Sequence, residues 1–165
     1  MLQGNLVALQ PYTLERCHAF WNEYVSDPAM WEMAFTYDPQ WVEQYYQKKV
    51  MDKSRRFFAI CHGEQTVGEI QLKYIDFEKS CGTMSIHFSC DKYKNRGFGT
   101  EAERLLVEYA FSELGLATVY ADCVLRNTRS QHVLQKLGFV YTHEDDILRY
   151  YKLERSQAVT KGRDV

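Results

Sequence analysis

The sequence predicts an α/β (α+β) fold with one mixed, mostly antiparallel sheet of about seven strands and about four helices. Two observations carry this prediction. A length of 165 residues favours a single domain with one core. Along the chain, short apolar runs bounded by turn residues alternate with segments whose apolar residues recur at helical spacing. We expect the domain to cover residues 1–155 and a polar C-terminal tail to cover 156–165.

The N-terminal segment predicts one strand followed by two helices. Leu6–Leu9 is a short apolar run, and Thr13 is a suitable N-cap for the helix that follows. Asp38-Pro39 starts the second helix, with Asp as the cap and Pro at the first helical position. The aromatic segment Ala29–Tyr37 lies between these helices, and its rings either pack in the core or face a substrate.

Three strands in an antiparallel meander are predicted next. They cover Arg56–Cys61, Thr66–Tyr74 and Cys81–Ser89, with polar turns at His62–Gln65 and Glu78–Ser80. Such short connections favour antiparallel pairing between successive strands.

A helix and a parallel strand follow. The helix is expected over Thr100–Leu114, and Thr100 and Glu103 have the spacing of a capping box at its start. Thr118–Val124 is rich in β-branched residues and is expected to form a buried strand, parallel to the last strand of the meander.

The C-terminal part predicts a helix and a hairpin. Asn127 can cap the helix, and Gly138 is suited to end it. Phe139–Thr142 and Ile147–Leu153 then form the two strands of the hairpin.

Composition excludes several classes of protein. A formal net charge of −2 gives no general attraction to nucleic acid or to anionic lipid. The five cysteines are widely spaced without a C-x-x-C pair, so we expect no metal site, although a cysteine nucleophile stays open. The segment Met1–Asn5 has no basic stretch followed by an apolar run, and no apolar stretch approaches about 18 residues. We therefore expect a cytoplasmic protein that binds neither membrane nor nucleic acid.

The stretch Lys94–Thr100 is the strongest candidate for a binding site. Its glycines, Gly97 and Gly99, allow a tight turn and a close approach of the backbone to a ligand. The helix behind them offers free N–H groups and a partial positive charge, which suits a phosphate or pyrophosphate. Lys94 and Arg96 add two cations. An ordinary glycine turn is the plain alternative.

Two other anion-binding motifs fit less well. A Walker loop would need Gly-Lys-Ser/Thr, which is absent from this stretch. Gly97–Ala102 fits the dinucleotide fingerprint G-x-G-x-x-G/A, and Asp122 follows at the expected distance. That motif needs a strand running almost directly into the glycines, however, and here the polar loop Cys90–Arg96 intervenes.

Three segments together, Tyr93–Thr100, Asn127–Ser130 and Gln135–Phe139, resemble the GNAT superfamily of N-acetyltransferases. That family carries an R/Q-x-x-G-x-G/A loop, a helix, a strand, an N-x-x-(A/S) helix start and a K-x-G-F helix end. The order of elements also matches over nearly the whole chain, and the last two motifs look most like the branch of ribosomal-protein N-terminal acetyltransferases. One departure is Lys94, which stands where the family has Arg or Gln.

The resemblance implies acetyl-CoA as co-substrate and a primary amine as acceptor, either a protein N-terminus or a small molecule. It also implies a sheet splayed near Ser89, direct attack by the amine on the thioester, and a monomer or homodimer. A non-catalytic CoA-binding regulatory homologue is the alternative. The cofactor-binding residues that it implies are Phe88, Ser89, Lys94, Asn95, Arg96, Gly97, Phe98, Gly99, Thr100, Asn127, Arg129 and Ser130.

Three residues are candidates for the chemistry that the resemblance implies. Glu69 is the first candidate for the base that receives the amine proton, and His87 is the second. Ser130 is the candidate for a hydrogen bond to the leaving thiolate, because Leu134 occupies the position where many family members have Tyr. Each has a plain alternative: a surface carboxylate, a packed strand histidine and a polar helix residue.

Acidic residues border the expected acceptor cleft and could attract a cationic amine. They are Glu32, Glu144, Asp145 and Asp146, and solvated loop charge is the plain alternative for each.

Overall fold

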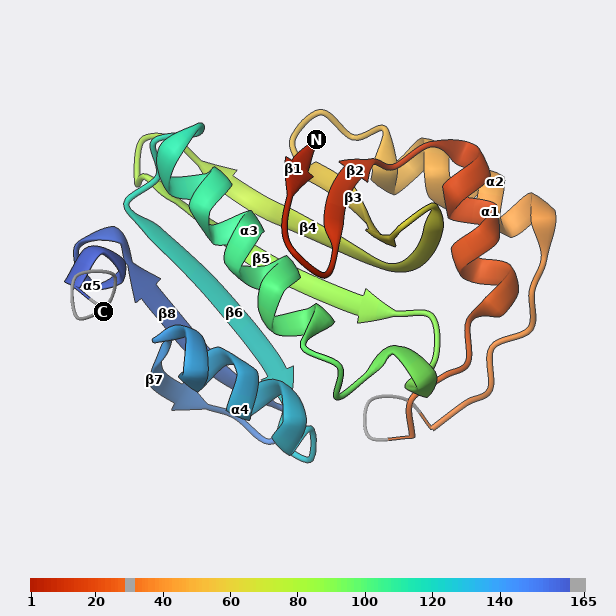
Figure 1. Cartoon of the computed structure of the whole chain (residues 1–165). Coiled ribbons are helices and arrows are strands. Elements are labelled where there is room, and N and C mark those ends of the chain that lie inside the picture. The colour runs from red at the N-terminus through yellow and green to blue at the C-terminus, as the bar shows by residue number, and fades with distance from the viewer. Residues whose placement is uncertain (29–31, 161–165) are drawn as a thin grey trace.

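The computed structural model describes residues 1–28 and 32–160, and it confirms the predicted fold class (Figure 1). One eight-stranded sheet comprises β1 (Leu2–Gln3), β2 (Ala8–Pro11), β3 (Arg56–His62), β4 (Gln65–Asp76), β5 (Cys81–Phe88), β6 (Thr118–Val124), β7 (Val140–Glu144) and β8 (Leu148–Glu154). The α-helices of the described residues are α1 (Leu14–Glu23), α2 (Pro39–Tyr45), α3 (Phe98–Ser112), α4 (Thr128–Leu137) and α5 (Arg155–Thr160). A π-helical turn (Tyr46–Val50) extends α2, and a 3₁₀ turn (Asp91–Tyr93) precedes α3.

The sheet opens between its two central strands. Its order is β1-β2-β3-β4-β5-β6-β8-β7, and among these neighbours β5 and β6 run parallel while the others are antiparallel. The β5–β6 ladder runs from Cys81↔Thr118 to Met84↔Ala121. Beyond Met84 the strands diverge, so the splay that the sequence placed near Ser89 begins earlier and frees one edge of residues 85–88.

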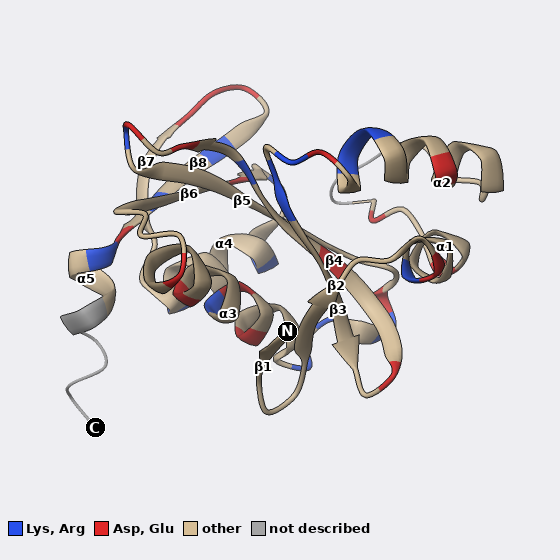
Figure 2. Ribbon diagram, turned by 90° about the horizontal axis from the view of Figure 1, so that it is seen from above, with Lys and Arg blue, Asp and Glu red and all other residues tan. Residues whose placement is uncertain are grey.

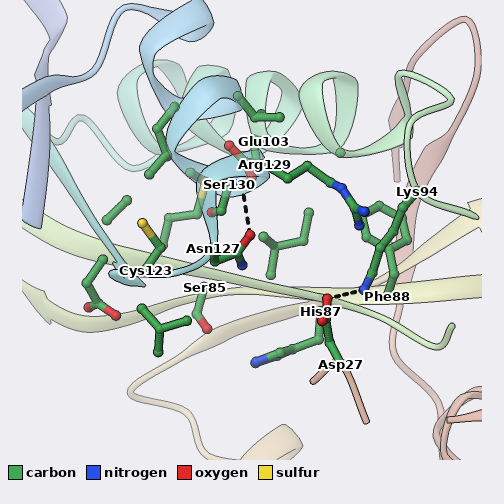
Figure 3. A pocket seen from close by; sticks show the side chains of 18 of the residues that line it. Asp27, Ser85, His87, Phe88, Lys94, Glu103, Cys123, Asn127, Arg129 and Ser130 are labelled. Carbon is green, nitrogen blue, oxygen red and sulfur yellow. Dashed lines mark hydrogen bonds and ion pairs between the residues drawn. The ribbon is translucent and has the colours of Figure 1, made fainter. Parts of the chain in front are cut away.

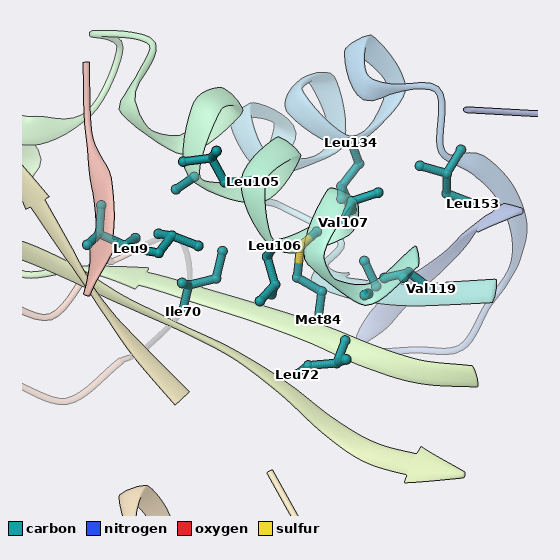
Figure 4. Packing of buried hydrophobic residues seen from close by; sticks show 14 of the residues in the cluster. Leu9, Ile70, Leu72, Met84, Leu105, Leu106, Val107, Val119, Leu134 and Leu153 are labelled. Atoms are coloured by element: carbon teal, nitrogen blue, oxygen red, sulfur yellow. The ribbon is translucent and has the colours of Figure 1, made fainter. Parts of the chain in front are cut away.

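Helices cover both faces of the sheet. Figure 2 shows α1 and α2 on the opposite side of the strands from α3. The larger core lies under α3, whose Leu105 and Leu106 point onto the sheet (Figure 4). Residues of that core on other elements include Leu9, Ile70, Leu72, Met84, Val119, Leu134 and Leu153. A second cluster of Tyr12, Cys17, Val42, Ala59 and Cys61 lies under α1 and α2. Each buried Leu or Ile contributes roughly 1.5–3 kcal/mol to this packing.

A buried carboxylate fixes the start of α3. The two Glu101 oxygens accept N–H bonds from Asn5, Leu6 and Val7 at 2.9, 2.7 and 2.8 Å. Burial raises the pKa of Glu101, but the three N–H groups outweigh it and the net pKa is lowered. The segment before β2 is thereby tied to the helix that follows the glycine turn.

Most helix ends follow the predicted caps, but the start of α3 does not. Thr13, Asp38 and Asn127 cap α1, α2 and α4, and Gly138 ends α4 with φ +97°. The predicted capping box is wrong: α3 begins at Phe98 behind Gly97, so Thr100 already lies inside the first turn.

The structure adds detail to the aromatic segment between α1 and α2 and to the C-terminal tail. Phe35 is half-buried and contacts Trp21 and Trp41, with ring centroids 5.0 and 5.3 Å apart, and Tyr37 packs against the second cluster, whereas Met33 is exposed. Residues 29–31 of that segment lie outside the described residues. The predicted polar tail begins as helix α5, and 161–165 also lie outside the description. Within the described chain, no helix has the length and apolar composition needed to cross a bilayer.

Candidate functional site

A cavity of about 530 Å³ occupies the opening between β5 and β6 (Figure 3). Its walls come from the open half of β5, the glycine turn and first turns of α3, the end of β6 and the start of α4. Tyr24, Val25 and Asp27, from the segment after α1, close one end. Segments distant in sequence therefore meet at the point where the ladder ends.

The glycine turn presents backbone N–H groups at one end of this cavity. Gly97 is the N-cap of α3 with φ +80°, and no side chain of the described residues caps it. The first intrahelical bond runs from the Glu101 N–H to the Gly97 carbonyl at 3.1 Å, so the N–H groups of residues 98–100 have no carbonyl one turn earlier. A Cβ at Gly99 would lie 3.4 Å from the Phe88 ring. These features suit the binding of an anion.

Lys94 and Arg96, the two cations predicted to lie beside a bound anion, make other contacts in the structure. Lys94 pairs with Asp27 and, at 2.6 Å, with Asp91. It therefore joins the turn to the segment after α1, and in this structure its charge is already compensated. Arg96 lies outside the cavity, with its guanidinium 4.9 Å from the centre of the Phe98 ring.

The first turn of α4 forms a second polar wall. The Asn127 carboxamide oxygen accepts the Ser130 N–H at 3.1 Å, which leaves its NH₂ group and the Ser130 hydroxyl at the cavity. Cys123 lies beside them, and burial raises the pKa of its thiol to about 11 although the Ser130 hydroxyl acts in the opposite direction. A thiol with that pKa is a weak nucleophile at neutral pH, which argues against covalent catalysis by this cysteine.

Glu69 and His87 lie opposite each other on β4 and β5. Glu69 is only 2% exposed, and its two oxygens accept hydrogen bonds from Tyr12 and Tyr45 at 2.8 and 2.9 Å. The His87 Nδ1 atom is 3.7 Å from Glu69 Oε1, and the His87 side chain is 27% exposed and lines the cavity. Of the two base candidates, His87 reaches the cavity and Glu69 lies behind it.

The two phenols support this arrangement. Burial raises the pKa of Tyr12 and of Tyr45, and the neighbouring Glu69 raises both further. Both phenols therefore stay protonated, and each donates a hydrogen bond to one of the two Glu69 oxygens.

Glu103 is a cavity residue that sequence reasoning missed. It is 3% exposed, and its Oε2 atom is buried without a hydrogen-bond partner among the described residues. Burial raises the pKa of its carboxyl to about 8, so it is mostly uncharged at neutral pH. The signal was helical spacing: Glu103 shares a face of α3 with Leu106, Val107 and Ala110, all of which are buried.

The structure brings most of the predicted site residues to one cavity, namely His87, Phe88, Lys94, Asn95, Gly97, Gly99, Thr100, Asn127, Arg129 and Ser130. Four others lie outside it: Glu69, Ser89, Arg96 and Phe98. Ser89 is fully buried, and its hydroxyl bonds Glu23 at 3.0 Å. The Phe98 ring is buried in the core and lies against His62.

Two of the four predicted acidic residues, Glu144 and Asp145, are engaged within the C-terminal hairpin. Glu144 pairs with Arg149 at 2.7 Å. Asp145 accepts the N–H groups of Ile147 and Leu148 and the Tyr150 hydroxyl. These contacts favour a structural role for the two carboxylates over attraction of an amine.

Comparison with known proteins places this fold and site in a family. The family model described as an acetyltransferase (GNAT) domain matches residues 7–140. The chain therefore belongs to the GNAT acetyltransferase family, whose co-substrate is acetyl-CoA.

Individual relatives agree at the level of family and fold. Spermidine N(1)-acetyltransferase of Escherichia coli (strain K12) is 33% identical over 95 residues, 57% of this chain and 50% of that protein. The probable N-acetyltransferase YjcK of Bacillus subtilis (strain 168) is 35% identical over 107 residues, 63% and 57% of the two chains. The chain thus spans about half the length of these curated relatives. A dodecameric spermidine N-acetyltransferase from Vibrio cholerae shares the fold with a TM-score of 0.76 at 16% identity, over 97% of this chain and 100% of that one.

The residues present fit acetyl-CoA. The free N–H groups at the start of α3 suit its pyrophosphate. The open edge of β5 offers backbone groups to the amides of the pantetheine arm. Glu103 lines the cavity, and its buried Oε2 atom has no hydrogen-bond partner among the described residues.

Proposed function

We propose that this protein transfers an acetyl group from acetyl-CoA to a primary amine by direct attack of the amine on the thioester. The observation that carries the proposal is the single cavity in which an anion-binding helix start, an open strand edge and a histidine meet. In this proposal the turn around Gly97 and Gly99 holds the pyrophosphate and the edge of β5 holds the arm. Acetyl-CoA supplies an activated acyl group.

His87 is the proposed base, with Glu69 as a positioning residue. The amine nitrogen forms a bond to the carbonyl carbon as the carbon–sulfur bond breaks, and His87 receives the proton that the amine loses. Glu69, whose Oε1 atom lies 3.7 Å from the imidazole Nδ1, orients the ring, while Tyr12 and Tyr45 hold Glu69 in place. This supports a relay in which the buried carboxylate itself does not meet the substrate.

Stabilisation of the departing sulfur is assigned to the first turn of α4. Ser130 lines the cavity, and the buried Leu134, one turn further along α4, has no proton to donate. Unpaired N–H groups on the edge of β5 are suited to polarise the thioester carbonyl, as an oxyanion hole does.

The acceptor that we propose first is a small polycationic amine. The relatives with that printed activity support it, and so does Asp122, which lines the cavity. The motifs at Asn127 and Gly138 support a protein N-terminus as the second acceptor class. For oligomeric state, the dodecamer described for the Vibrio cholerae protein and the monomer or homodimer expected from sequence are both open to measurement.

The experiment is thiol release from acetyl-CoA with a panel of amines. Spermidine, a diamine, an amino acid amide and a peptide with a free N-terminus would each be offered to the purified chain. We expect amine-dependent thiol release and a product heavier by one acetyl group, with His87→Ala lowering kcat. Binding of acetyl-CoA without turnover on every amine would instead favour the non-catalytic regulatory homologue.

A further inference from the structure

The buried carboxyl of Glu103 has no role in the chemistry described above. It projects from α3 at the same wall of the cavity as Ser130 and Cys123 (Figure 3). Besides burial, Glu103 raises the pKa of the Cys123 thiol, whereas the Ser130 hydroxyl lowers it. His87 lies on the other side of β5 from it. A carboxyl oxygen that is buried without a partner destabilises the fold, so its place in a binding cavity requires an explanation.

The surroundings of Glu103 do not supply a counter-charge. Lys94, from the glycine turn, is engaged by Asp27 and Asp91, and Arg104 on the same helix pairs with Glu108. The ionisable groups that line the cavity with it are Asp27, Lys73, His87, Lys94, Cys123, Asp122 and Arg129. Burial is the cause of its raised pKa, and no cation opposes that effect. The carboxyl is therefore an O–H donor and not an anion at neutral pH.

We propose that the buried, unpartnered carboxyl of Glu103 in the cavity wall forms a hydrogen bond with an amide of the acetyl-CoA arm. The inference rests on the proposed function, because it takes acetyl-CoA as the occupant of the cavity. It assigns to Glu103 a part in binding and none in proton transfer to the acceptor.

The chemistry of the arm matches what the cavity lacks. The pantetheine arm carries two amides, and each loses its water when it enters a cavity walled by groups such as Met84, Val133 and Leu134. A carboxylic acid can donate its O–H to an amide carbonyl and accept an N–H with its other oxygen. The contact would give the arm amide a partner in place of its lost water, and the Glu103 carboxyl a partner that the described residues do not supply.

Affinity should then follow the fraction of protein in which Glu103 is protonated. With the pKa of the carboxyl raised to about 8, that fraction falls about tenfold between pH 7 and pH 9. The apparent dissociation constant for acetyl-CoA should rise about tenfold over the same interval. The phosphate monoester of acetyl-CoA has a second pKa near 6 and is about nine-tenths ionised at pH 7, so its remaining change is small and is shared by every variant. A thioester has no free thiol.

The test is calorimetric titration of acetyl-CoA, without an amine, into wild type, Glu103→Gln and Glu103→Leu at pH 7 and pH 9. The Gln variant keeps a hydrogen-bond donor that does not ionise, so it should bind nearly as tightly as wild type at pH 7 and equally at pH 9. The Leu variant should bind more weakly than Gln at pH 7 and show no drop at pH 9. Glu108→Gln, an exposed site on the same helix, should keep the wild-type pH dependence.

The outcomes separate this inference from the proposed function. If wild type binds at pH 7 but its affinity falls no more than that of Glu103→Gln at pH 9, the Glu103 contact is refuted and the acetyltransferase proposal stands. Equal affinity of the Leu and Gln variants at pH 7 would also refute it. No binding of acetyl-CoA by wild type at pH 7 would overturn both. Circular dichroism spectra matching wild type show that each variant is folded.

Discussion

Replacing Glu103 by Gln should stabilise the folded chain by an amount that grows with pH. In the unfolded chain this carboxyl titrates near its ordinary value of 4.5, whereas burial raises its pKa to about 8 in the fold. Between those values the folded state holds a proton that the unfolded state has lost, so wild-type stability falls as pH rises. Each pH unit in this window costs about 1.4 kcal/mol.

The magnitude follows from a double difference. From pH 5.5 to pH 7.5 the wild-type chain should lose about 2.5 kcal/mol of unfolding free energy through Glu103, and Glu103→Gln should lose none of it. Urea denaturation of both proteins at both pH values measures this, and subtraction removes the groups that they share. The same stability difference at the two pH values would show that the carboxyl is not held neutral by burial. Glu108→Gln serves as the exposed control.

Three further perturbations test other parts of the structure. Glu101→Gln should destabilise the fold by roughly 1–3 kcal/mol, because three N–H groups lose a charged acceptor. Since the pKa of Glu101 is lowered in the fold, this contribution is full above the ordinary value of 4.5, and urea denaturation should show the wild-type advantage vanish as pH falls from there through the lowered pKa. Gly99→Val should weaken acetyl-CoA binding at least about tenfold in calorimetry while the circular dichroism spectrum is kept, since a β-branched side chain would fill the anion site. Ser130→Ala should lower kcat more than it raises KM for acetyl-CoA, and an unchanged kcat would make Ser130 a structural residue.

Short sequence patterns, such as a capping residue or a terminal glycine, predicted the ends of several helices and strands correctly. Thr118–Val124 has the predicted bounds, and α4 lies between its predicted Asn127 cap and Gly138 stop. β1 escaped prediction because a two-residue strand carries no periodicity. The capping box failed for a physical reason: a Thr-x-x-Glu spacing also arises inside a first helical turn when a glycine with positive φ starts the helix earlier.

Burial and pairing of polar residues depended on contacts distant in sequence. Glu69 was predicted as the first candidate base, with a surface carboxylate as the alternative, and its burial could not be predicted because its partners Tyr12 and Tyr45 come from other elements. Lys94 looked like a free cation, although its partner Asp27 lies 67 residues earlier. The spacing of apolar residues indicated that the helix face with Glu103 is buried. A carboxylate is rarely buried, however, so its place in a cavity could not be predicted from the sequence.

The central claim is that acetyl-CoA occupies the opening between β5 and β6 with its pyrophosphate on the first turn of α3. A crystal structure of the chain with CoA tests it most directly. We predict pyrophosphate oxygens within hydrogen-bond distance of the backbone N–H groups of residues 96–100, and the arm along the open edge of β5 at residues 85–88. A cofactor bound anywhere else on the molecule would contradict this account of the site.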